Sequence, residues 1–456
     1  MKQRYMHPPV LVYAPAAGSA KYRCVVKWQG GQDAMELATP EFDLAGIWQK
    51  LPAAGPFRVE VEAVDAQGKT LANVGGDCQR IADFKGPYRP AARGYDEAGA
   101  KTVGWLIKQG EGAGTRGFGA NFRSSYVRLL TSYVRFNPKG ELAEKALALA
   151  KVHGVALLKA STPGDWVYAN MPLSHDSDQS LQIGSSARGG LCYFELYDVT
   201  QDKSWLDAAG RIGDTLKKTQ LSYGRWPWRV EPRTGKTLSD YTSDQVFAIV
   251  LLDELASRRG RQDLIETRDR AVAWMLANPC KTFRWEGLFE DVGDQPPFSN
   301  LHFFDTMWFV EHLMRYATAG NGYEKIALEQ MLYAEDQFVE WEPTGNYVTP
   351  GCREQYVCYH VIAGHAANYI RACLACHVRT RDDIWLKKAR AMADTLTCIQ
   401  HAQGFYGTFP THEPTKEVPG GLRNLSYGDI WSNDTSYCGE MLLRLNEYMK
   451  TAGAKP

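Results

Sequence analysis

The run Val246-Phe247-Ala248-Ile249-Val250-Leu251-Leu252 decides the fold, because it places seven consecutive apolar residues inside a longer stretch of helical periodicity. The helix predicted there, over 243–258, is apolar on every side, and such a helix is buried on every side. The next segment, 262–277, differs because Arg, Asp and Glu occupy one of its faces. A buried helix followed by an amphipathic one predicts an inner and an outer layer of helices.

The same alternation extends from about residue 91 to the C-terminus. Apolar residues at helical spacing predict twelve helices, over 95–109, 122–136, 141–160, 178–199, 203–220, 243–258, 262–277, 302–318, 323–340, 355–378, 382–401 and 434–451. Those near 141, 203, 262, 323 and 382 are amphipathic, whereas those near 178, 243, 302, 355 and 434 are more apolar or rich in small residues. The sequence therefore predicts a mainly α fold with an (α/α)6 toroid over 91–456, whose outer ring the helix at 95–109 closes.

Residues 1–90 follow a different pattern, that of β-strands. Apolar and polar residues alternate over 57–63, a second strand is predicted over 22–28, and Asp65-Ala66-Gln67-Gly68 supplies a turn. Between the two strands, 42–48 has the pattern of a short helical turn. These elements predict a small immunoglobulin-like or fibronectin-like β-sandwich, joined to the toroid by Gly86-Pro87-Tyr88-Arg89-Pro90.

Composition limits the partners. Lys+Arg and Asp+Glu are balanced at 52 each, so neither a nucleic-acid face nor a membrane face is predicted, and no stretch approaches a membrane-spanning length. The ten cysteines fall mostly in predicted helices, which fits buried free thiols in a cytoplasmic, reducing compartment; the alternative is a secreted or periplasmic protein whose leader has been removed. Cys373-x-x-Cys376-His377 alone does not predict a metal. No metal and no cofactor are predicted, and the oligomeric state is left open.

Connection lengths predict where function lies. Links from inner to outer helices are short, whereas those from outer to inner helices are long: about 110–121, 161–177, 221–242, 278–301, 341–354 and 402–433. All long loops therefore meet at the N-terminal ends of the inner helices, and long ordered loops are usually functional. Their aromatic side chains have the character of a sugar-stacking surface, although some of them are also expected to plug the end of the toroid.

The chain resembles carbohydrate-active (α/α)-toroid enzymes, both polysaccharide lyases and six-hairpin glycosidases. The local phrases that carry the resemblance are Arg225-Trp226-Pro227-Trp228-Arg229, Gly404-Phe405-Tyr406-Gly407-Thr408-Phe409 and Asp429-Ile430-Trp431-Ser432-Asn433-Asp434. Several such families carry an N-terminal β-domain. The resemblance implies a polysaccharide or oligosaccharide substrate, with substrate-binding residues Trp166, Tyr168, Asn170, Trp226, Trp228, Arg229, Trp285, Tyr356, Tyr406 and Trp431.

Hydrolysis and elimination need different side chains. A glycosidase needs two carboxyl groups roughly 5–10 Å apart, and the loops and helix starts offer Asp176, Asp178, Asp240, Asp244, Asp291, Asp294, Asp305, Glu354, Asp429 and Asp434. An aspartate near a helix start is often only a cap. Asp178, Asp244 and Asp434 are interpreted as caps for this reason.

A uronate lyase must neutralise the substrate carboxylate, remove the α-proton and protonate the leaving oxygen. The chain is similar to toroid-fold alginate and glucuronan lyases, and this likeness implies His302 as base, Tyr359 as acid or shared acid/base, and Arg353 as neutraliser. Asn300, His360, Tyr241 and His175 complete the expected catalytic set. His312 and His365 are interpreted as core histidines. A lyase is the leading hypothesis; a glycoside hydrolase, a non-catalytic glycan-binding protein and a sugar epimerase are the alternatives.

Overall fold

The computed structural model describes residues 2–110, 119–174, 180–287, 295–411, 423–424 and 430–453. The chain divides into two compact units, Met1–Lys85 with Leu332–Glu342, and Gly86–Met331 with Pro343–Pro456. The sequence analysis, which set one boundary at residue 90, did not foresee that 332–342 groups with the N-terminal residues. No helix within the described residues is both long and apolar enough to span a membrane.

The first unit is built from short strands. Its elements are β1 (Arg4–Tyr5), β2 (Val10–Val12), β3 (Lys21–Trp28), β4 (Gly31–Leu37), β5 (Glu41–Asp43), α1 (Ala45–Trp48), β6 (Gly55–Val64), β7 (Thr70–Arg80) and β11 (Val339–Glu340). Five strands form a sheet in the order β1-β7-β6-β3-β4, and β2 pairs with β5. Alternate side chains such as Cys24, Val26, Val59 and Val61 are buried in one core. The strands predicted over 22–28 and 57–63 are thereby confirmed.

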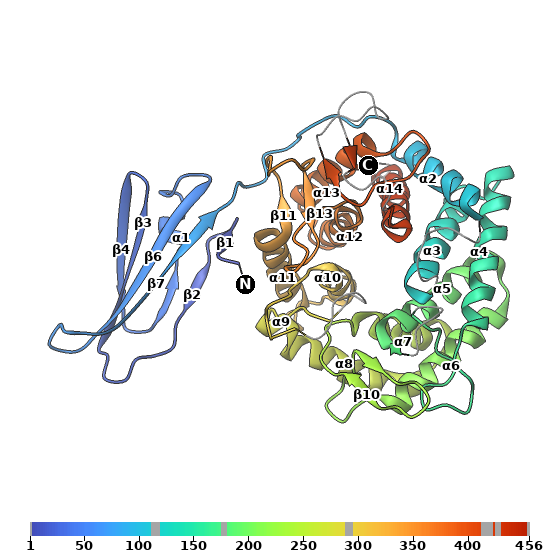
Figure 1. Ribbon diagram of the computed structural model, residues 1–456, viewed down its shortest axis with the longest axis horizontal. Helices are drawn as coiled ribbons and strands as arrows, with labels where there is room; N and C mark the ends of the chain where they lie inside the picture. The colour runs from blue at the N-terminus through green and yellow to red at the C-terminus, as the bar shows by residue number, and fades with distance from the viewer. Residues whose placement is uncertain are drawn as a thin grey trace. The chain divides into compact units, whose positions relative to one another are not determined.

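The second unit is a ring of paired helices (Figure 1). The inner helices are α3 (Ala120–Phe136), α5 (Ile183–Thr200), α7 (Val246–Arg259), α10 (Phe304–Tyr316), α12 (Ala363–Thr380) and α14 (Ser432–Gly453). The outer helices are α2 (Tyr95–Gln109), α4 (Glu141–Lys159), α6 (Lys203–Thr219), α8 (Ile265–Ala277), α11 (Tyr323–Phe338) and α13 (Asp383–Ile399), with a short α9 (Pro279–Thr282) after α8. The last turns of α11, from Leu332 on, are grouped with the first unit. Consecutive inner helices contact one another, and α14 contacts α3. The ring is therefore closed, as an (α/α)6 toroid requires.

Two of the short links from inner to outer helices, those after α5 and α12, have the same local structure. Gln201 and Arg381 end α5 and α12 in the left-handed backbone region, with φ of 59° and 60°. Asp202 and Asp382 follow and cap α6 and α13 by accepting hydrogen bonds from the backbone N–H groups two residues on. A left-handed residue followed by an aspartate cap reverses the chain within a few residues. Because the short links lie at the C-terminal ends of the inner helices, the long connections lie at their N-terminal ends.

That opposite end carries small strands, and here the sequence analysis needs a correction. The strands are β8 (Leu181–Gln182), β9 (Arg229–Val230), β10 (Thr237–Ser239), β12 (Gly351–Arg353), β13 (Val361–Ile362), β14 (Pro410–Thr411) and β15 (Arg423–Asn424). The helix predicted from 355 begins at Ala363. Strand β13 pairs with β12 instead of extending that helix, since Cys352 lies opposite Ile362. Tyr356, Tyr359 and His360 consequently lie in a hairpin, not on α12.

A buried charge network lies near the middle of the inner helices α3, α12 and α14. Glu440 Oε1 lies 2.8 Å from Arg128 Nη2, 3.4 Å from Arg371 Nη2 and 2.8 Å from Arg444 Nε. Burial acts to raise the pKa of Glu440, but these three guanidinium groups hold it well below its ordinary value. Arg128 and Arg371 also lie 4.3 and 3.9 Å from the ring of Trp308. The inner helices are thus joined by paired charges as well as by apolar packing.

Candidate active site

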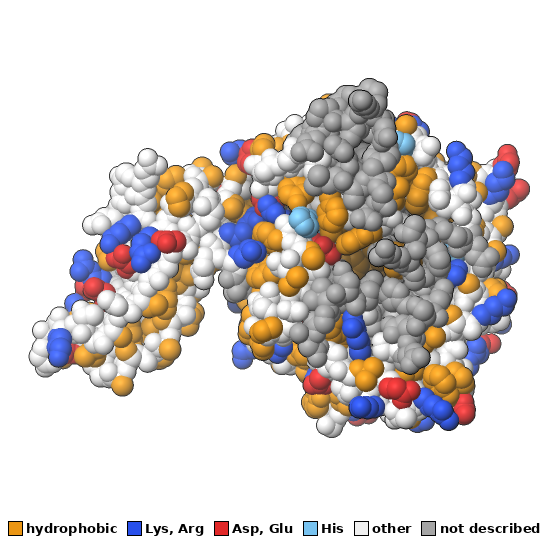
Figure 2. Space-filling model, viewed as in Figure 1, with side chains coloured by type: hydrophobic (Ala, Val, Ile, Leu, Met, Phe, Trp, Pro, Cys, Tyr) orange, Lys and Arg blue, Asp and Glu red, His pale blue; other side chains and the backbone are white. Residues whose placement is uncertain are grey.

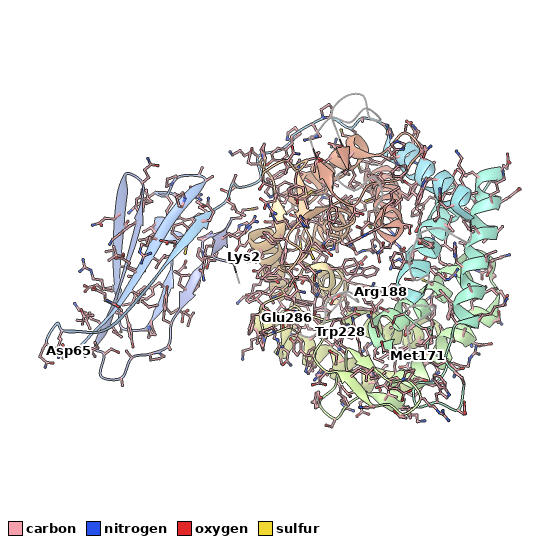
Figure 3. All side chains as sticks on the ribbon, in the orientation of Figure 1. Lys2, Asp65, Met171, Arg188, Trp228 and Glu286 are labelled. Atoms are coloured by element: carbon pink, nitrogen blue, oxygen red, sulfur yellow. The ribbon has the colours of Figure 1, made fainter. Side chains whose placement is uncertain are left out.

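Polar side chains meet inside the ring at the N-terminal ends of the inner helices. Arg188 belongs to α5, Ser243 and Asp244 precede α7, His302 precedes α10, and Asp305 lies in the first turn of α10. All five are at most 9% exposed, and Figure 3 shows Arg188 on the inner side of the ring. On the face seen in Figure 2, hydrophobic side chains gather near the middle of the ring and charged ones at its edge.

The centre of this cluster is a pair of neighbouring buried carboxyl groups, Asp244 and Asp305, whose titrations are linked. Burial and the neighbouring Asp244 carboxyl raise the pKa of Asp305 well above its ordinary value. Arg188 Nη2 lies 3.6 Å from Asp244 Oδ1 and favours the ionised form of that carboxyl. These surroundings therefore favour the protonated form of Asp305 and the ionised form of Asp244.

Neighbouring side chains hold Asp305 and Arg188 in place. Ser243 Oγ donates a hydrogen bond of 3.0 Å to Asp305 Oδ2, and His302 Nε2 lies 3.6 Å from the same oxygen. The Arg188 guanidinium lies 4.1 Å from the ring of Phe247 and 5.2 Å from that of Phe304. Contacts of this kind between a cation and aromatic faces are strongest away from water. The carboxyl pair thus lies in a preorganised, water-poor setting.

A third buried carboxyl, Asp434, lies in the first turn of α14. Burial raises its pKa to about 8, so the group is mostly protonated at neutral pH. Glycines make room for two of the three carboxyls. A Cβ at Gly364 would lie 2.3 Å from Asp434 Oδ1, and one at Gly184 would lie 1.9 Å from Asp244 Oδ2. Each of these two aspartates therefore packs against a glycine at the start of the preceding inner helix.

Two histidines connect the carboxyl pair to the loops above it. Burial, with His365 and Arg188 nearby, lowers the pKa of His302 to about 3, and burial lowers that of His365 to about 3 as well. Both imidazoles are therefore neutral. The His365 ring is hydrogen-bonded to the backbone of Arg353, and His302 forms a β-bridge with Gln355. The hairpin that contains Arg353 is thereby fixed directly to the buried cluster.

A strip of aromatic and cationic side chains continues from that hairpin; this rim strip consists of Arg353, Tyr359, Tyr347, His360, Phe409 and Trp431. The Arg353 guanidinium lies 4.5 Å from the ring of Tyr359, and its Nη1 donates 2.6 Å to the Tyr359 carbonyl. Tyr347 Oη and His360 Nδ1 are 2.5 Å apart. The ring centroids of His360 and Phe409 are 5.1 Å apart, and those of Phe409 and Trp431 are 6.0 Å apart. Because His360 is exposed and Arg353, Tyr359, Phe409 and Trp431 are partly so, a ligand can reach this strip.

The predicted catalytic residues fall into several groups. His302 lies in the buried cluster, whereas Arg353, Tyr359 and His360 lie on the rim strip. Asn300 holds the hairpin in place through two hydrogen bonds. Its Nδ2 donates to Gln355 Oε1 at 2.7 Å, and its Oδ1 accepts from the Val357 N–H. The Tyr241 hydroxyl is bound to the Arg284 carbonyl at 2.8 Å. His175 lies outside the described residues.

The predicted sugar-binding residues fall into a buried group and a partly exposed group. Five rings offer no exposed face, since Tyr168, Trp226, Trp228, Trp285 and Tyr406 are at most 4% exposed. Trp226 Nε1 donates to the Leu216 carbonyl and Trp285 Nε1 to Gln330 Oε1. These rings anchor loops onto the outer helices, and the expectation that they stack on sugars is corrected here. The other predicted binding residues, Trp166, Asn170, Arg229, Tyr356 and Trp431, are partly exposed.

Two residues of the buried cluster were not predicted in this role, since Arg188 was not expected at the site and Asp244 was expected to be a helix cap. A signal for Arg188 was present, because an arginine among Ser185, Ser186, Ala187, Gly189 and Gly190 stands in a helix predicted to be buried, and buried arginines are almost always paired. The cap predicted at Asp244 is wrong, because Gln245 holds the capping position of α7. Asp244 instead contacts Asp305 and Arg188, residues far away in the sequence.

The described residues contain no group of three or more His, Cys, Asp or Glu side chains arranged to hold a metal ion. Cys373 and Cys376 are buried free thiols on α12. The neighbouring His377 is bound instead to the Tyr448 hydroxyl, 2.6 Å from its Nδ1.

No protein-family model and no curated protein sequence matches the chain. Solved structures do match. A family 76 glycoside hydrolase from a bovine Bacteroides thetaiotaomicron strain is 11% identical with a TM-score of 0.56, covering 96% of this chain and 95% of that one. Cellobiose 2-epimerase from Spirochaeta thermophila is 11% identical with a TM-score of 0.58, covering 78% and 97%. An unsaturated glucuronyl hydrolase specific for heparin is 12% identical with a TM-score of 0.54, covering 78% and 98%. The protein shares the fold of these structures.

Proposed function

We propose that the protein is a carbohydrate-active enzyme that hydrolyses a glycosidic bond, with Asp434 and the Asp244–Asp305 pair as its acid–base groups. The observation that carries the proposal is the pair of neighbouring carboxyls, Asp244 and Asp305, buried at the starts of two consecutive inner helices beside Arg188. Burying two like ionisable groups destabilises a fold, and such arrangements concentrate at functional sites. Two of the similar structures are a glycoside hydrolase and a glucuronyl hydrolase, which agrees with this choice.

The proposed reaction uses one carboxyl as acid and another as base. Asp434, protonated at neutral pH, donates its proton to the glycosidic oxygen as the bond from that oxygen to the anomeric carbon breaks. A water molecule forms the new bond to the anomeric carbon and gives its proton to the Asp244 carboxylate. Arg188 stabilises that carboxylate before the step, and Asp305 shares the added proton afterwards. A proton returned through solvent from the pair to Asp434 completes the cycle.

The rim strip supports an acidic sugar as substrate. The Arg353 guanidinium is partly exposed and lies over the Tyr359 ring, and a cation in this position attracts a uronate carboxylate. The rings of Phe409 and Trp431 provide apolar faces for neighbouring sugar rings. The strip adjoins the buried cluster through His365, so a sugar bound on it extends toward the carboxyls.

β-Elimination is the second candidate, favoured by the position of His302 beside Asp305. A lyase needs a strong base for the α-proton, and an imidazole whose pKa is lowered to about 3 by burial accepts protons poorly. Hydrolysis through the carboxyls is therefore the better match to these electrostatics.

One assay separates the candidates. The protein is incubated with alginate, glucuronan and neutral polysaccharides, while reducing ends and the ultraviolet absorbance of an unsaturated uronate are followed together. Hydrolysis predicts reducing ends without that absorbance, and Asp305→Asn, which removes one titrating carboxyl of the pair, is expected to abolish them. Absorbance rising with the reducing ends would establish elimination instead. Binding without any product would mark a glycan-binding protein and overturn the proposal.

A further inference from the structure

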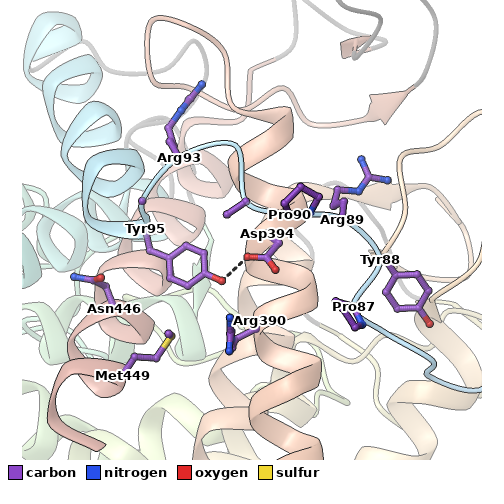
Figure 4. A pocket seen from close by; sticks show the side chains of 12 residues that line it. Pro87, Tyr88, Arg89, Pro90, Arg93, Tyr95, Arg390, Asp394, Asn446 and Met449 are labelled. Carbon is purple, nitrogen blue, oxygen red and sulfur yellow. Dashed lines mark hydrogen bonds between the residues drawn. The ribbon is translucent and has the colours of Figure 1, made fainter. Parts of the chain in front are cut away.

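A groove of about 750 Å³ lies on the helical unit, away from the candidate active site (Figure 4). The linker residues 87–94, the first residue of α2, the outer face of α13 and the C-terminal part of α14 line it. Asn446 of this groove is twelve residues beyond Asp434 on the same helix, which corresponds to about 18 Å along its axis. The groove is therefore separate from the buried carboxyls, and its volume falls in the range of ligand sites.

The floor of the groove is a trio of residues from two outer helices, Tyr95, Asp394 and Arg390. Tyr95 Oη donates a hydrogen bond to Asp394 Oδ1 at 2.5 Å (Figure 4). Burial and the bond to Asp394 raise the pKa of Tyr95, so its hydroxyl stays neutral and donates. Arg390 is exposed. The trio therefore presents a fixed carboxylate and a guanidinium side by side.

Cationic and amide donors surround that floor. The lining residues include three arginines, Arg89, Arg93 and Arg390, and one acidic residue, Asp394, which gives an excess of two positive charges. Arg93 Nη1 donates to Gln400 Oε1 at 2.6 Å, and Arg89 Nη2 donates to the Thr349 carbonyl at 2.5 Å. Each of these bonds uses one of five guanidinium N–H groups. The Asn446 amide has no hydrogen-bond partner among the described residues, so it is available to a ligand.

We propose that this groove is a second saccharide-binding site that takes an acidic sugar. Arg93 and Arg390 bind the sugar carboxylate, while Asp394 and Asn446 take its hydroxyl groups. Asp394 disfavours a compact dianion such as phosphate, but it accepts hydrogen bonds from neutral hydroxyls. Met449 and Pro87 offer apolar surface to the face of a sugar ring. This mixture of donors, an acceptor and apolar surface matches a uronate unit better than a simple anion.

The second site serves long substrates. A polymer bound in the groove stays near the rim after each cleavage, because tethering converts the next encounter into an intramolecular event. A short oligosaccharide cannot reach both sites and gains nothing. The groove itself does not depend on whether the rim hydrolyses, eliminates or only binds.

Calorimetric titration of the full chain carrying Asp305→Asn, with an alginate trisaccharide as probe, tests the proposal. Two sites are expected, and Arg93→Ala with Arg390→Ala is expected to weaken one of them by roughly tenfold or more. Arg259→Ala is the control, since this arginine pairs on the surface with Asp207 at 2.6 Å and lies outside the groove. Thermal unfolding and the Arg390→Lys variant show whether the fold is intact.

The outcomes separate this proposal from the proposed function. A single site that disappears with Arg93→Ala and Arg390→Ala would support the groove and count against the rim. A single site that persists in that variant would overturn the groove. Equal binding of a neutral cello-oligosaccharide, or complete displacement by inorganic phosphate, would overturn the assignment to an acidic sugar.

Discussion

Replacing Asp434 with asparagine is expected to make the protein more stable at neutral pH and inactive. The side chain is buried in the first turn of α14, and burial raises its pKa from about 3.8 to about 8. Below pH 4 the carboxyl is protonated in both the folded and unfolded states and adds no penalty. Between pH 4 and 8 only the unfolded chain releases the proton, so the folded state loses stability as the pH rises.

The magnitude follows from the two pKa values. Each pH unit between them corresponds to about 1.4 kcal/mol. The penalty at pH 7 is therefore on the order of 4 kcal/mol, a large share of the roughly 5–15 kcal/mol that stabilises a folded domain. An asparagine at 434 is nearly isosteric and fits the space above Gly364, but it does not titrate. Any constant cost of burying its amide shifts the stability equally at every pH.

The measurement is urea unfolding of the wild type and Asp434→Asn at several pH values from 4.5 to 8. The difference in unfolding free energy is expected to grow by on the order of 1 kcal/mol per pH unit in favour of the variant. Other titrating groups cancel in this difference. Asp96→Asn, an exposed first-turn aspartate of α2, serves as control and is expected to change stability by less than about 0.5 kcal/mol. A difference that stays constant across the pH range would refute the buried, protonated carboxyl.

Further predictions concern the site and its supports. Asp244→Asn is expected to lower kcat by about a hundredfold or more with circular dichroism unchanged; activity near wild type would remove it from the reaction. Gly364→Ala places a Cβ 2.3 Å from Asp434 Oδ1 and is expected to destabilise by about 1–3 kcal/mol. Gly104→Ala meets nothing within 4 Å and is expected to stabilise α2 by about 0.5–1 kcal/mol; equal Tm shifts for both would contradict the steric argument. Arg353→Ala is expected to raise KM for acidic substrates alone, with partial recovery in Arg353→Lys; an equal rise for neutral substrates would count against carboxylate recognition.

The fold could be predicted because it depends on local periodicity. Each of the twelve expected helices is present, since an apolar stripe at 3.6-residue spacing is visible in the sequence without any knowledge of its partner. The errors lie at the loop ends. Val361 and Ile362 extend the apolar pattern of α12, but they pair with Cys352 and Arg353 as strands. Only the three-dimensional neighbour distinguishes a hairpin from another turn of helix there.

The sequence predicted the end of the ring at which the buried carboxyls lie, but it did not predict which side chains form that cluster. Loop lengths indicated the N-terminal ends of the inner helices, where the buried carboxyls lie. The choice among carboxyls depends on distant contacts, such as Gly184 beneath Asp244 and Arg188 beside it, and no local pattern distinguishes these from an ordinary cap. Likewise, Trp226 and Trp285 lie in loops as stacking residues would, but their indole N–H groups are bound inside the protein.

The two buried charge clusters lie at different levels of the inner helices, and the helix dipole acts on only one of them. N-terminal turns carry partial positive charge, and this effect falls off within the first turn. Asp305 and Asp434 lie in first turns, where an anion formed during a reaction is stabilised, whereas Glu440 lies near the middle of the inner helices between Arg128 and Arg371. A ring of six parallel inner helices brings all their N-termini to one rim. The dipoles at that rim therefore offset part of the cost of ionising a buried carboxyl, while the paired charges in the middle of the ring join neighbouring inner helices.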